Sequence, residues 1–182
     1  VTNPKTVYEI TKTASDEAVA NSDQNFVIIR PSIIFGEKMI NSSLRQMIKL
    51  VQLKLFFYIE KDALLNYVHV KDVVKALICC GISKKFEKKI YIVSQSTTVL
   101  RAVKSFCRGL ETIEPTFVLS KKIVIFLVPL FKWLPNFPLT LQRIEALTSK
   151  CVYDSEDFIL ETGFKFHNSL EHQFESYARS VK

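Results

Sequence analysis

The chain has 182 residues, of which 48% are apolar and 24% charged, so it can bury a core and is neither a disordered tail nor a low-complexity linker. Its 25 Lys and Arg against 18 Asp and Glu give a formal net charge of +7. The lysines are scattered along the chain, so we expect no nucleic-acid partner.

Hydrophobic periodicity predicts an alternation of helices and strands. Continuous apolar runs of strand length occur at FVIIR (26–30) and KIYIVS (89–94), as in strands buried on both faces of a parallel sheet. We therefore expect these two runs to be parallel neighbours. Shorter strands are predicted at residues 65–70 and 151–153, and residues 32–38 are expected to form a loop.

Helical periods and capping residues predict the remaining elements. Asp72 is the expected N-cap of the apolar helix that follows it, and Gly163 is the expected end of another helix. The predicted helices are residues 8–21, a helix capped by residues 41–43, residues 73–82, 96–110, 139–148, 155–162 and 168–181. Helices and strands alternate without an internal repeat, which predicts the α/β class.

Cysteine, histidine and glycine spacings exclude several kinds of site. The four cysteines lack C-x-x-C spacing, and neither they nor the three histidines form a zinc pattern. We expect reduced thiols, a cytoplasmic protein and no metal. The four glycines are too far apart to form a G-x-G-x-x-G turn or a P-loop.

The segment KKIVIFLVPLFKWLPNFP (121–138) is too short and too interrupted to span a membrane. Its basic flank and Trp133 also fit a position at a membrane interface. We favour the other interpretation, a hydrophobic helix that covers the substrate pocket or packs on the C-terminal helices.

Tyr8 and Lys12 stand four residues apart in the first predicted helix, so their side chains share one face. A phenol has a pKa of about 10, and a neighbouring ammonium lowers that pKa by favouring the phenolate. Such a tyrosine can move a proton on a hydroxyl or carbonyl while a cofactor moves the hydride. The spacing alone also fits a surface pair, and Tyr67 and Lys71 share it where a strand runs into a helix.

Several motifs follow one another in a fixed order. YEITK (8–12), preceded by Asn3-Pro4, is followed by FVIIRPSIIFG, LNYVHVKDVVKAL and KIYIVS, and the tail carries VYDSEDFILETGF and SLE. In this order they resemble the C-terminal half of an extended short-chain dehydrogenase/reductase, and more narrowly the NAD-dependent epimerase/dehydratase family that acts on nucleotide sugars. The resemblance implies the C-terminal part of a Rossmann-type doubly wound parallel sheet and a mostly helical substrate-binding lobe.

The resemblance also implies roles for individual residues. Tyr8 would be the catalytic acid/base. Lys12 would lower the pKa of Tyr8 and hydrogen-bond the nicotinamide ribose of NAD or NADP, so that both side chains contact the cofactor. The residues beside the nicotinamide, at the end of a strand, would be Pro31, Ser32 and Ile33.

Two departures from the family pattern concern the substrate. Ile33 stands where many members have Asn, and Leu65 stands where many have an Arg that binds the diphosphate. Arg143 is the remaining candidate for the diphosphate of a nucleotide sugar, with a solvated helix residue as the alternative. His69 is expected to be structural.

The resemblance divides the chain into residues 1–36 and 66–96, the end of the dinucleotide-binding domain, and residues 37–65 and 97–182, the substrate-binding lobe. The family's Gly-rich half would lie before Val1, so we expect this chain alone to be an inactive fragment of an enzyme that forms a homodimer. The expected function is an NAD(P)-dependent nucleotide-sugar epimerase/dehydratase or 4-ketoreductase. The alternatives are a non-catalytic nucleotide-binding accessory or scaffold subunit, and a hydroxysteroid-type dehydrogenase.

Overall fold

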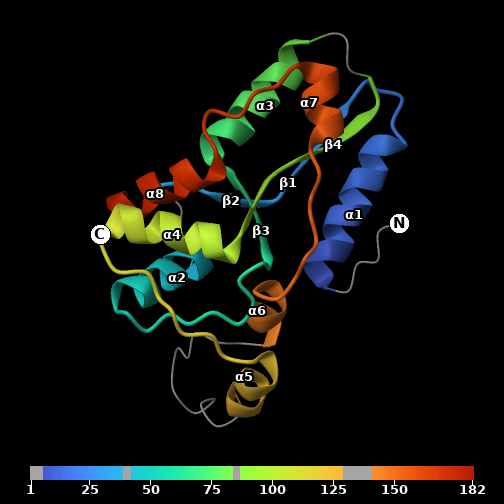
Figure 1. Ribbon diagram of the computed structural model, residues 1–182. Coiled ribbons are helices and arrows are strands. Elements are labelled where there is room, and N and C mark those ends of the chain that lie inside the picture. Colours follow the sequence, from blue (N-terminus) through green and yellow to red (C-terminus); the bar gives the residue numbers. More distant parts are fainter. Residues whose placement is uncertain (1–5, 39–41, 84–86, 129–140) are drawn as a thin grey trace.

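Strands and helices alternate along the chain in the computed structural model, which describes residues 6–38, 42–83, 87–128 and 141–182 (Figure 1). The strands are β1 (Val27–Pro31), β2 (Ile33–Phe35), β3 (Leu64–His69), β4 (Lys89–Val93) and β5 (Gln95–Thr98). The helices are α1 (Val7–Ala20), α2 (Ser42–Gln52), α3 (Val70–Ile82), α4 (Val99–Leu110), α5 (Lys121–Leu127), α6 (Leu141–Ala146), α7 (Glu156–Thr162) and α8 (Leu170–Ser180).

The first sheet consists of β1 and β4, which pair in parallel from Val27 opposite Lys89 to Pro31 opposite Val93. This pairing confirms the prediction made for FVIIR and KIYIVS. Tyr91 and Val93 of β4 point into a core that is shared with α3 and α7. The expectation that both faces are buried is wrong for β4, because Ile90 and Ile92, which alternate with Tyr91 and Val93, are 46% and 39% exposed.

The second sheet, in the order β2-β3-β5, corrects two sequence predictions. Residues 33–35 are a strand parallel to β3, within the segment expected to be a loop. Residues 96–98, expected to begin a helix, belong to β5, which is antiparallel to β3. Thr98 then caps α4, since its hydroxyl accepts a hydrogen bond from the Arg101 N–H at 3.2 Å.

The start of α3 also differs from the prediction. Asp72 is not the N-cap, because the helix begins two residues earlier and the side chain of His69 caps it by accepting from the Lys71 N–H. Asp72 is buried instead, and its carboxylate accepts hydrogen bonds from the backbone of His167 at 2.8 Å and from Gln173 Nε2 at 2.7 Å. It therefore joins the first turn of α3 to the C-terminal segment.

Residues 151–153 do not form the short strand that was predicted. They are held by a side chain, because the Asn66 amide donates to the Cys151 carbonyl at 2.9 Å and accepts from the Tyr153 N–H at 3.0 Å. The predicted helix end at Gly163 is confirmed, with the left-handed φ of 65° that favours glycine.

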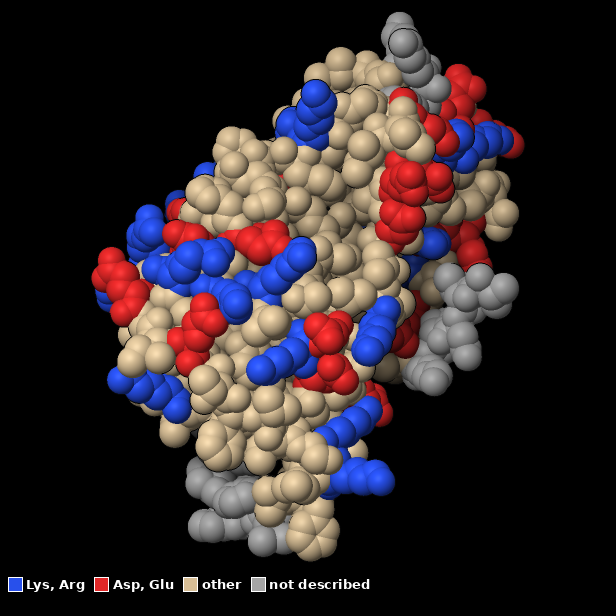
Figure 2. Space-filling model, in the orientation of Figure 1, with Lys and Arg blue, Asp and Glu red and all other residues tan. Residues whose placement is uncertain are grey.

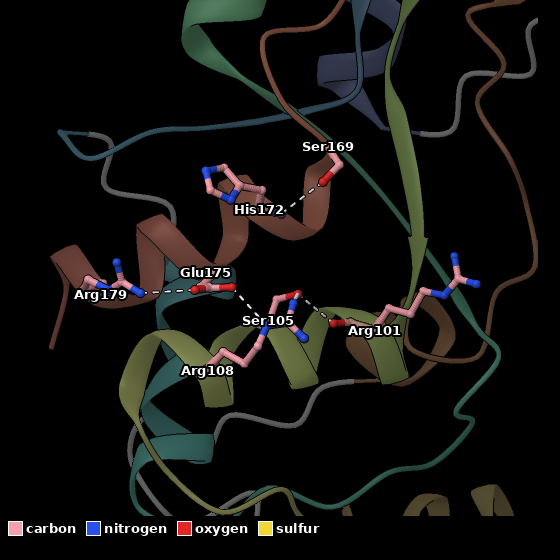
Figure 3. A network of polar contacts seen from close by, with 7 residues as sticks. All are labelled: Arg101, Ser105, Arg108, Ser169, His172, Glu175 and Arg179. Atoms are coloured by element: carbon pink, nitrogen blue, oxygen red, sulfur yellow. Dashed lines mark hydrogen bonds and ion pairs between the residues drawn. The ribbon is translucent and has the colours of Figure 1, made fainter.

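Helices α4 and α8 run side by side and form the centre of the largest core, with Phe35, Phe106 and Phe174 fully buried. A Cβ atom on Gly109 would lie 2.3 Å from the Glu175 carbonyl oxygen, so the two backbones approach closely there. On the outer side, Glu175 pairs with Arg108 at 3.0 Å and with Arg179 at 3.1 Å (Figure 3). These contacts fix the lobe that carries α2, α4 and α8.

On the face shown in Figure 2, Lys and Arg are interspersed with Asp and Glu on a mostly uncharged surface, and they form no continuous basic patch. No described helix is both long enough and apolar enough to cross a lipid bilayer. Some sequence predictions concern residues that the structure does not describe, namely Asn3-Pro4, Asn41, Trp133 and the rest of residues 129–140.

Candidate functional site

The helix that carries Tyr8 and Lys12 is almost detached from the core. α1 has no buried residue, although a reciprocal pair of hydrogen bonds between Thr6 and Glu9 caps its first turn. The Tyr8 side chain is 70% exposed, and the Lys12 ammonium lies 5.8 Å from the centre of its ring. The two side chains therefore share one open face, as the spacing predicts.

An ion pair sets the position of this face relative to the first sheet. Arg30, the residue before the last of β1, binds Asp16 of α1 through two nitrogens at 2.7 Å. α1 runs antiparallel to β1 (Figure 1), so residues before Asp16 lie beyond Arg30 in the direction of the strand's carboxyl end. Lys12 is about 6 Å from Asp16 along the helix axis, and Ser32 is about 6–7 Å from Arg30 along the strand. The first turns of α1, which carry Tyr8 and Lys12, therefore extend toward the carboxyl end of β1, where Ser32 follows the strand.

Pro31, Ser32 and Ile33 lie at the carboxyl edge of this sheet, where open α/β sheets bind ligands. The Ser32 N–H donates to the carbonyl of Val93, the last residue of β4, at 3.1 Å. The Ser32 hydroxyl is buried and has no hydrogen-bond partner among the described residues. Ile33 is 50% exposed. One unsatisfied hydroxyl and one open apolar side chain thus follow Pro31.

An open groove of about 420 Å³ begins at the same edge of the sheet, at Ser94. Ser155 closes its base, since its hydroxyl donates to the Ser94 carbonyl and accepts from the Ser94 N–H. Its other lining residues are Ser96, Val152, Tyr153, Asp154, Glu156, Ile159 and Leu160. None of the predicted site residues lines this groove.

Arg143 lies on a different element, α6, and is half-buried. Its guanidinium donates a short hydrogen bond to the side-chain oxygen of Gln46 in α2. It also acts on Tyr67 of β3: burial raises the pKa of this phenol to about 12, and the positive charge of Arg143 opposes that rise. Tyr67 and Gln46 are therefore polar neighbours of Arg143 that sequence reasoning missed.

The alternation of apolar and polar residues in β3 is the signal in the sequence that indicates a buried Tyr67. Tyr67 and Leu65 alternate with Asn66 in β3, and both are buried in the large core. Leu65 is therefore a packing residue at the position where the family pattern has a phosphate-binding Arg.

The residues at the carboxyl edge fit the nicotinamide end of a dinucleotide. The Ser32 hydroxyl lacks a partner among the described residues, and a carboxamide could supply one. Tyr8 and Lys12 present a phenol and an ammonium on the helix that Arg30 of β1 binds. The chain contains no glycine-rich turn that could bind the pyrophosphate.

A search of curated proteins finds no match to this sequence. The model of the NAD dependent epimerase/dehydratase family matches residues 1–93, which is just over half of the chain. This match includes Tyr8, Lys12 and the whole of the first sheet.

Solved structures of nucleotide-sugar enzymes have a similar fold. UDP-glucose 4-epimerase from Thermotoga maritima, solved with UDP-glucose, aligns with a TM-score of 0.65 at 13% identity over 98% of this chain and 54% of its own. WbmG from Bordetella bronchiseptica, solved with NAD and UDP, aligns with a TM-score of 0.69 at 15% identity over 98% of this chain and 51% of its own. UDP-glucuronic acid 4-epimerase from Bacillus cereus, solved with NAD, aligns with a TM-score of 0.69 at 11% identity over 100% of this chain and 53% of its own.

The chain thus spans about half the length of the structures that it matches, and at these identities the likeness shows the fold. It confirms the predicted class, the C-terminal part of a Rossmann-type parallel sheet with a mostly helical lobe. Together with the family match over the first 93 residues, the parallel pair β1–β4 and the Tyr-x-x-x-Lys helix beside it place this chain in the NAD-dependent epimerase/dehydratase family.

Proposed function

We propose that this protein takes part in NAD(P)-dependent chemistry on a nucleotide sugar, as an epimerase, a dehydratase or a 4-ketoreductase. The observation that carries the proposal is the position of Tyr8 and Lys12, one helical turn apart on an open face of α1, the helix that Arg30 of β1 binds through Asp16. Residues 1–36 and 66–96 serve the cofactor in this proposal, and residues 37–65 and 97–182 serve the sugar nucleotide.

Tyr8 is the proposed acid/base. Its phenol exchanges a proton with a sugar hydroxyl or carbonyl, and the bound cofactor accepts or returns the hydride. The Lys12 ammonium lies 5.8 Å from the centre of the Tyr8 ring, and in this proposal it donates hydrogen bonds to the ribose hydroxyls of the nicotinamide.

Two further contacts complete the proposed site. Ser32 donates its hydroxyl to the nicotinamide carboxamide, with Pro31 and Ile33 packing beside the ring. Arg143 binds the diphosphate of the substrate, because a guanidinium forms charge-assisted hydrogen bonds to phosphate oxygens. Its neighbours Gln46 and Tyr67 orient that guanidinium.

The experiment is a turnover assay of the full-length protein with NAD(P) and UDP- and dTDP-hexoses. Tyr8→Phe should lower turnover by about a hundredfold or more, because general acid/base catalysis supplies a factor of that size. Cofactor affinity should change little, since only a hydroxyl is removed. Lys12→Ala should lower both the turnover and the affinity for the cofactor.

Tyr153→Phe is the matched control, because it removes the hydroxyl of another exposed tyrosine that lies outside the proposed site. Full activity of Tyr8→Phe would assign Tyr8 to the surface. The second candidate function, nucleotide binding without turnover, has its own support in the apolar Leu65 and Ile33. It predicts cofactor binding that Lys12→Ala weakens, with no turnover of any nucleotide sugar.

A further inference from the structure

The end of the molecule formed by α5 exposes large apolar side chains that the proposed function does not use. Phe117 is 72% exposed and Phe126 is 73% exposed, and Val118 and Ile123 are also exposed. With Lys121 and Lys122 these four residues are named the α5 tip. In the ribbon view, α5 lies at the end of the molecule away from the first sheet (Figure 1).

Among the described residues, packing does not explain the exposure of the α5 tip. Val124 and Val128, one turn apart on the helix, are buried against Ile144 of α6 in a small separate core. Ile123 and Phe126, three residues apart, lie on another side of the helix that has no such cover among the described residues. The helix is thus anchored by one side and presents the other outward.

The charges at the α5 tip have one sign. The sequence has no acidic residue from 115 to 128, whereas Lys121 and Lys122 follow one another at the start of α5. The Lys121 ammonium donates a hydrogen bond to the Thr148 hydroxyl at 2.9 Å, and this neutral partner does not cancel its charge. In Figure 2 this end of the molecule is tan with blue side chains on its flank, and no red atom is visible there among the described residues.

We propose that the α5 tip binds the surface of an anionic lipid membrane. Phe126, Ile123 and Phe117 enter the boundary between headgroups and acyl chains, and Lys121 and Lys122 contact lipid phosphates. Exposed Phe and Ile side chains beside lysines are typical of a segment that lies at a membrane interface. The net charge of +7 also favours approach to an anionic surface.

An anionic bilayer fits this tip better than a protein groove does, because a flat lipid surface accepts a projecting apolar end without a matching shape. The proposal is independent of the proposed function, since Tyr8, Lys12, Ser32 and Arg143 all lie outside the α5 tip. Failure of either one leaves the other unaffected.

The test is co-sedimentation of the full chain with vesicles of phosphatidylcholine and phosphatidylglycerol, and with vesicles of phosphatidylcholine alone. We expect binding to the first kind only, weakened by high salt because salt screens the lysines. Phe126→Asp should lower the partition coefficient by about tenfold or more. The double variant Lys121→Glu/Lys122→Glu should lower it by about the same factor, because each lysine near an anionic surface contributes severalfold.

Two matched controls should lose much less binding than the variants of the α5 tip if the proposal is right. Leu160→Asp changes another apolar side chain that is 73% exposed, on α7. Lys71→Glu/Lys165→Glu makes the same change in charge at exposed positions outside the tip. Circular dichroism establishes that each variant is folded, and Phe117→Asp replaces Phe126→Asp should the latter unfold.

Two results would overturn the proposal. One is wild-type protein that stays in the supernatant with anionic vesicles. In that case, a dimer in analytical ultracentrifugation that Phe126→Asp dissociates would assign the tip to contact with a second copy. The other is equal loss of binding in Leu160→Asp and Phe126→Asp, which would show that no particular surface is responsible.

Discussion

The Arg143 guanidinium donates to the Gln46 side chain and lies near the Tyr67 phenol, at a boundary between α6, α2 and β3. A residue held in this way is oriented before a ligand arrives. Orientation before binding lowers the entropy cost of holding a diphosphate, to which a guanidinium forms charge-assisted hydrogen bonds.

We therefore predict that Arg143→Ala raises the Michaelis constant for a nucleotide sugar at least tenfold and changes the turnover number much less. A contact remote from the reacting carbon binds the ground state and the transition state alike. Steady-state kinetics of the full-length protein measures both constants, with the exposed Arg101→Ala as control. Unchanged affinity for UDP in Arg143→Ala would assign the residue to the solvated surface of α6.

His69 stands at the junction of β3 and α3, and the neutral form of its ring caps the helix. Burial is the main cause that lowers the pKa of His69 below its ordinary value, and Lys71 and His167 act in the same direction. The carboxylates of Asp72 and Glu37 oppose this shift. The structural role expected for His69 is consistent with this cap.

The lowered pKa makes stability depend on pH. The unfolded state has the ordinary histidine pKa of about 6.5 and binds a proton below that pH, whereas the folded state does so only at lower pH. The contribution of His69 is therefore complete above about pH 6.5 and is lost as the pH falls from there toward the folded pKa.

Urea unfolding at a series of pH values checks this prediction. His69→Asn keeps a side-chain acceptor at the N-cap but cannot titrate, so the free energy of unfolding of this variant should fall less steeply with acid than that of wild type. His172→Asn, at an exposed position, should retain the wild-type pH dependence. Identical curves for wild type and His69→Asn would contradict the assignment.

At the scale of elements, the sequence predicted those whose pattern is local and missed those that depend on partners. The sequence predicts β1 and β4 because both are continuous apolar runs. β2 has three residues, and its pairing with β3 is invisible to local periodicity. β5 reads QSTT, a polar segment without alternation, and it becomes a strand because β3 offers an antiparallel edge.

Two helical glycines give a matched test of packing between elements. A Cβ on Gly109 would lie 2.3 Å from the Glu175 carbonyl oxygen and 2.9 Å from Ala178, whereas a Cβ on Gly81 would meet nothing within 4 Å. Gly109→Ala must therefore push α4 and α8 apart. It should lower the free energy of unfolding by about 2 kcal/mol or more.

Gly81→Ala should instead raise the free energy of unfolding by about 0.5 kcal/mol, because alanine has the higher helix propensity and the site near the end of α3 is open. Both variants can be compared by urea unfolding monitored by circular dichroism. Equal effects of the two substitutions would show that α4 and α8 do not approach at Gly109 as closely as described.

At the scale of the whole molecule, the candidate site was predicted only in part. The helical spacing of Tyr8 and Lys12 and the strand end at Pro31 are local features, so the sequence was sufficient for them. The position of α1 relative to the first sheet depends on the ion pair of Asp16 with Arg30, which joins residues 14 positions apart. The neighbours of Arg143 come from α2 and β3 and could not be read from local pattern.

The four glycines of the chain all have structural positions. Gly36 follows β2, where a Cβ would lie 2.6 Å from Val70, and Gly163 ends α7 with a left-handed φ of 65°. Gly81 lies within α3, and Gly109 lies at the crossing of α4 and α8. None of them forms a turn that presents consecutive N–H groups to a pyrophosphate.

We predict that these 182 residues, taken alone, bind NAD weakly, with a dissociation constant of about 1 mM or higher. Tyr8, Lys12 and Ser32 contact only the nicotinamide end, whereas pyrophosphate binding needs backbone N–H groups at a helix N-terminus reached through a glycine turn. Titration calorimetry with NAD measures the affinity, and Lys12→Ala establishes whether any heat comes from this face. Saturable binding in the micromolar range would mean that another part of the described fold binds the pyrophosphate, and the open groove at Ser94 and Ser155 would be the first place to look for it.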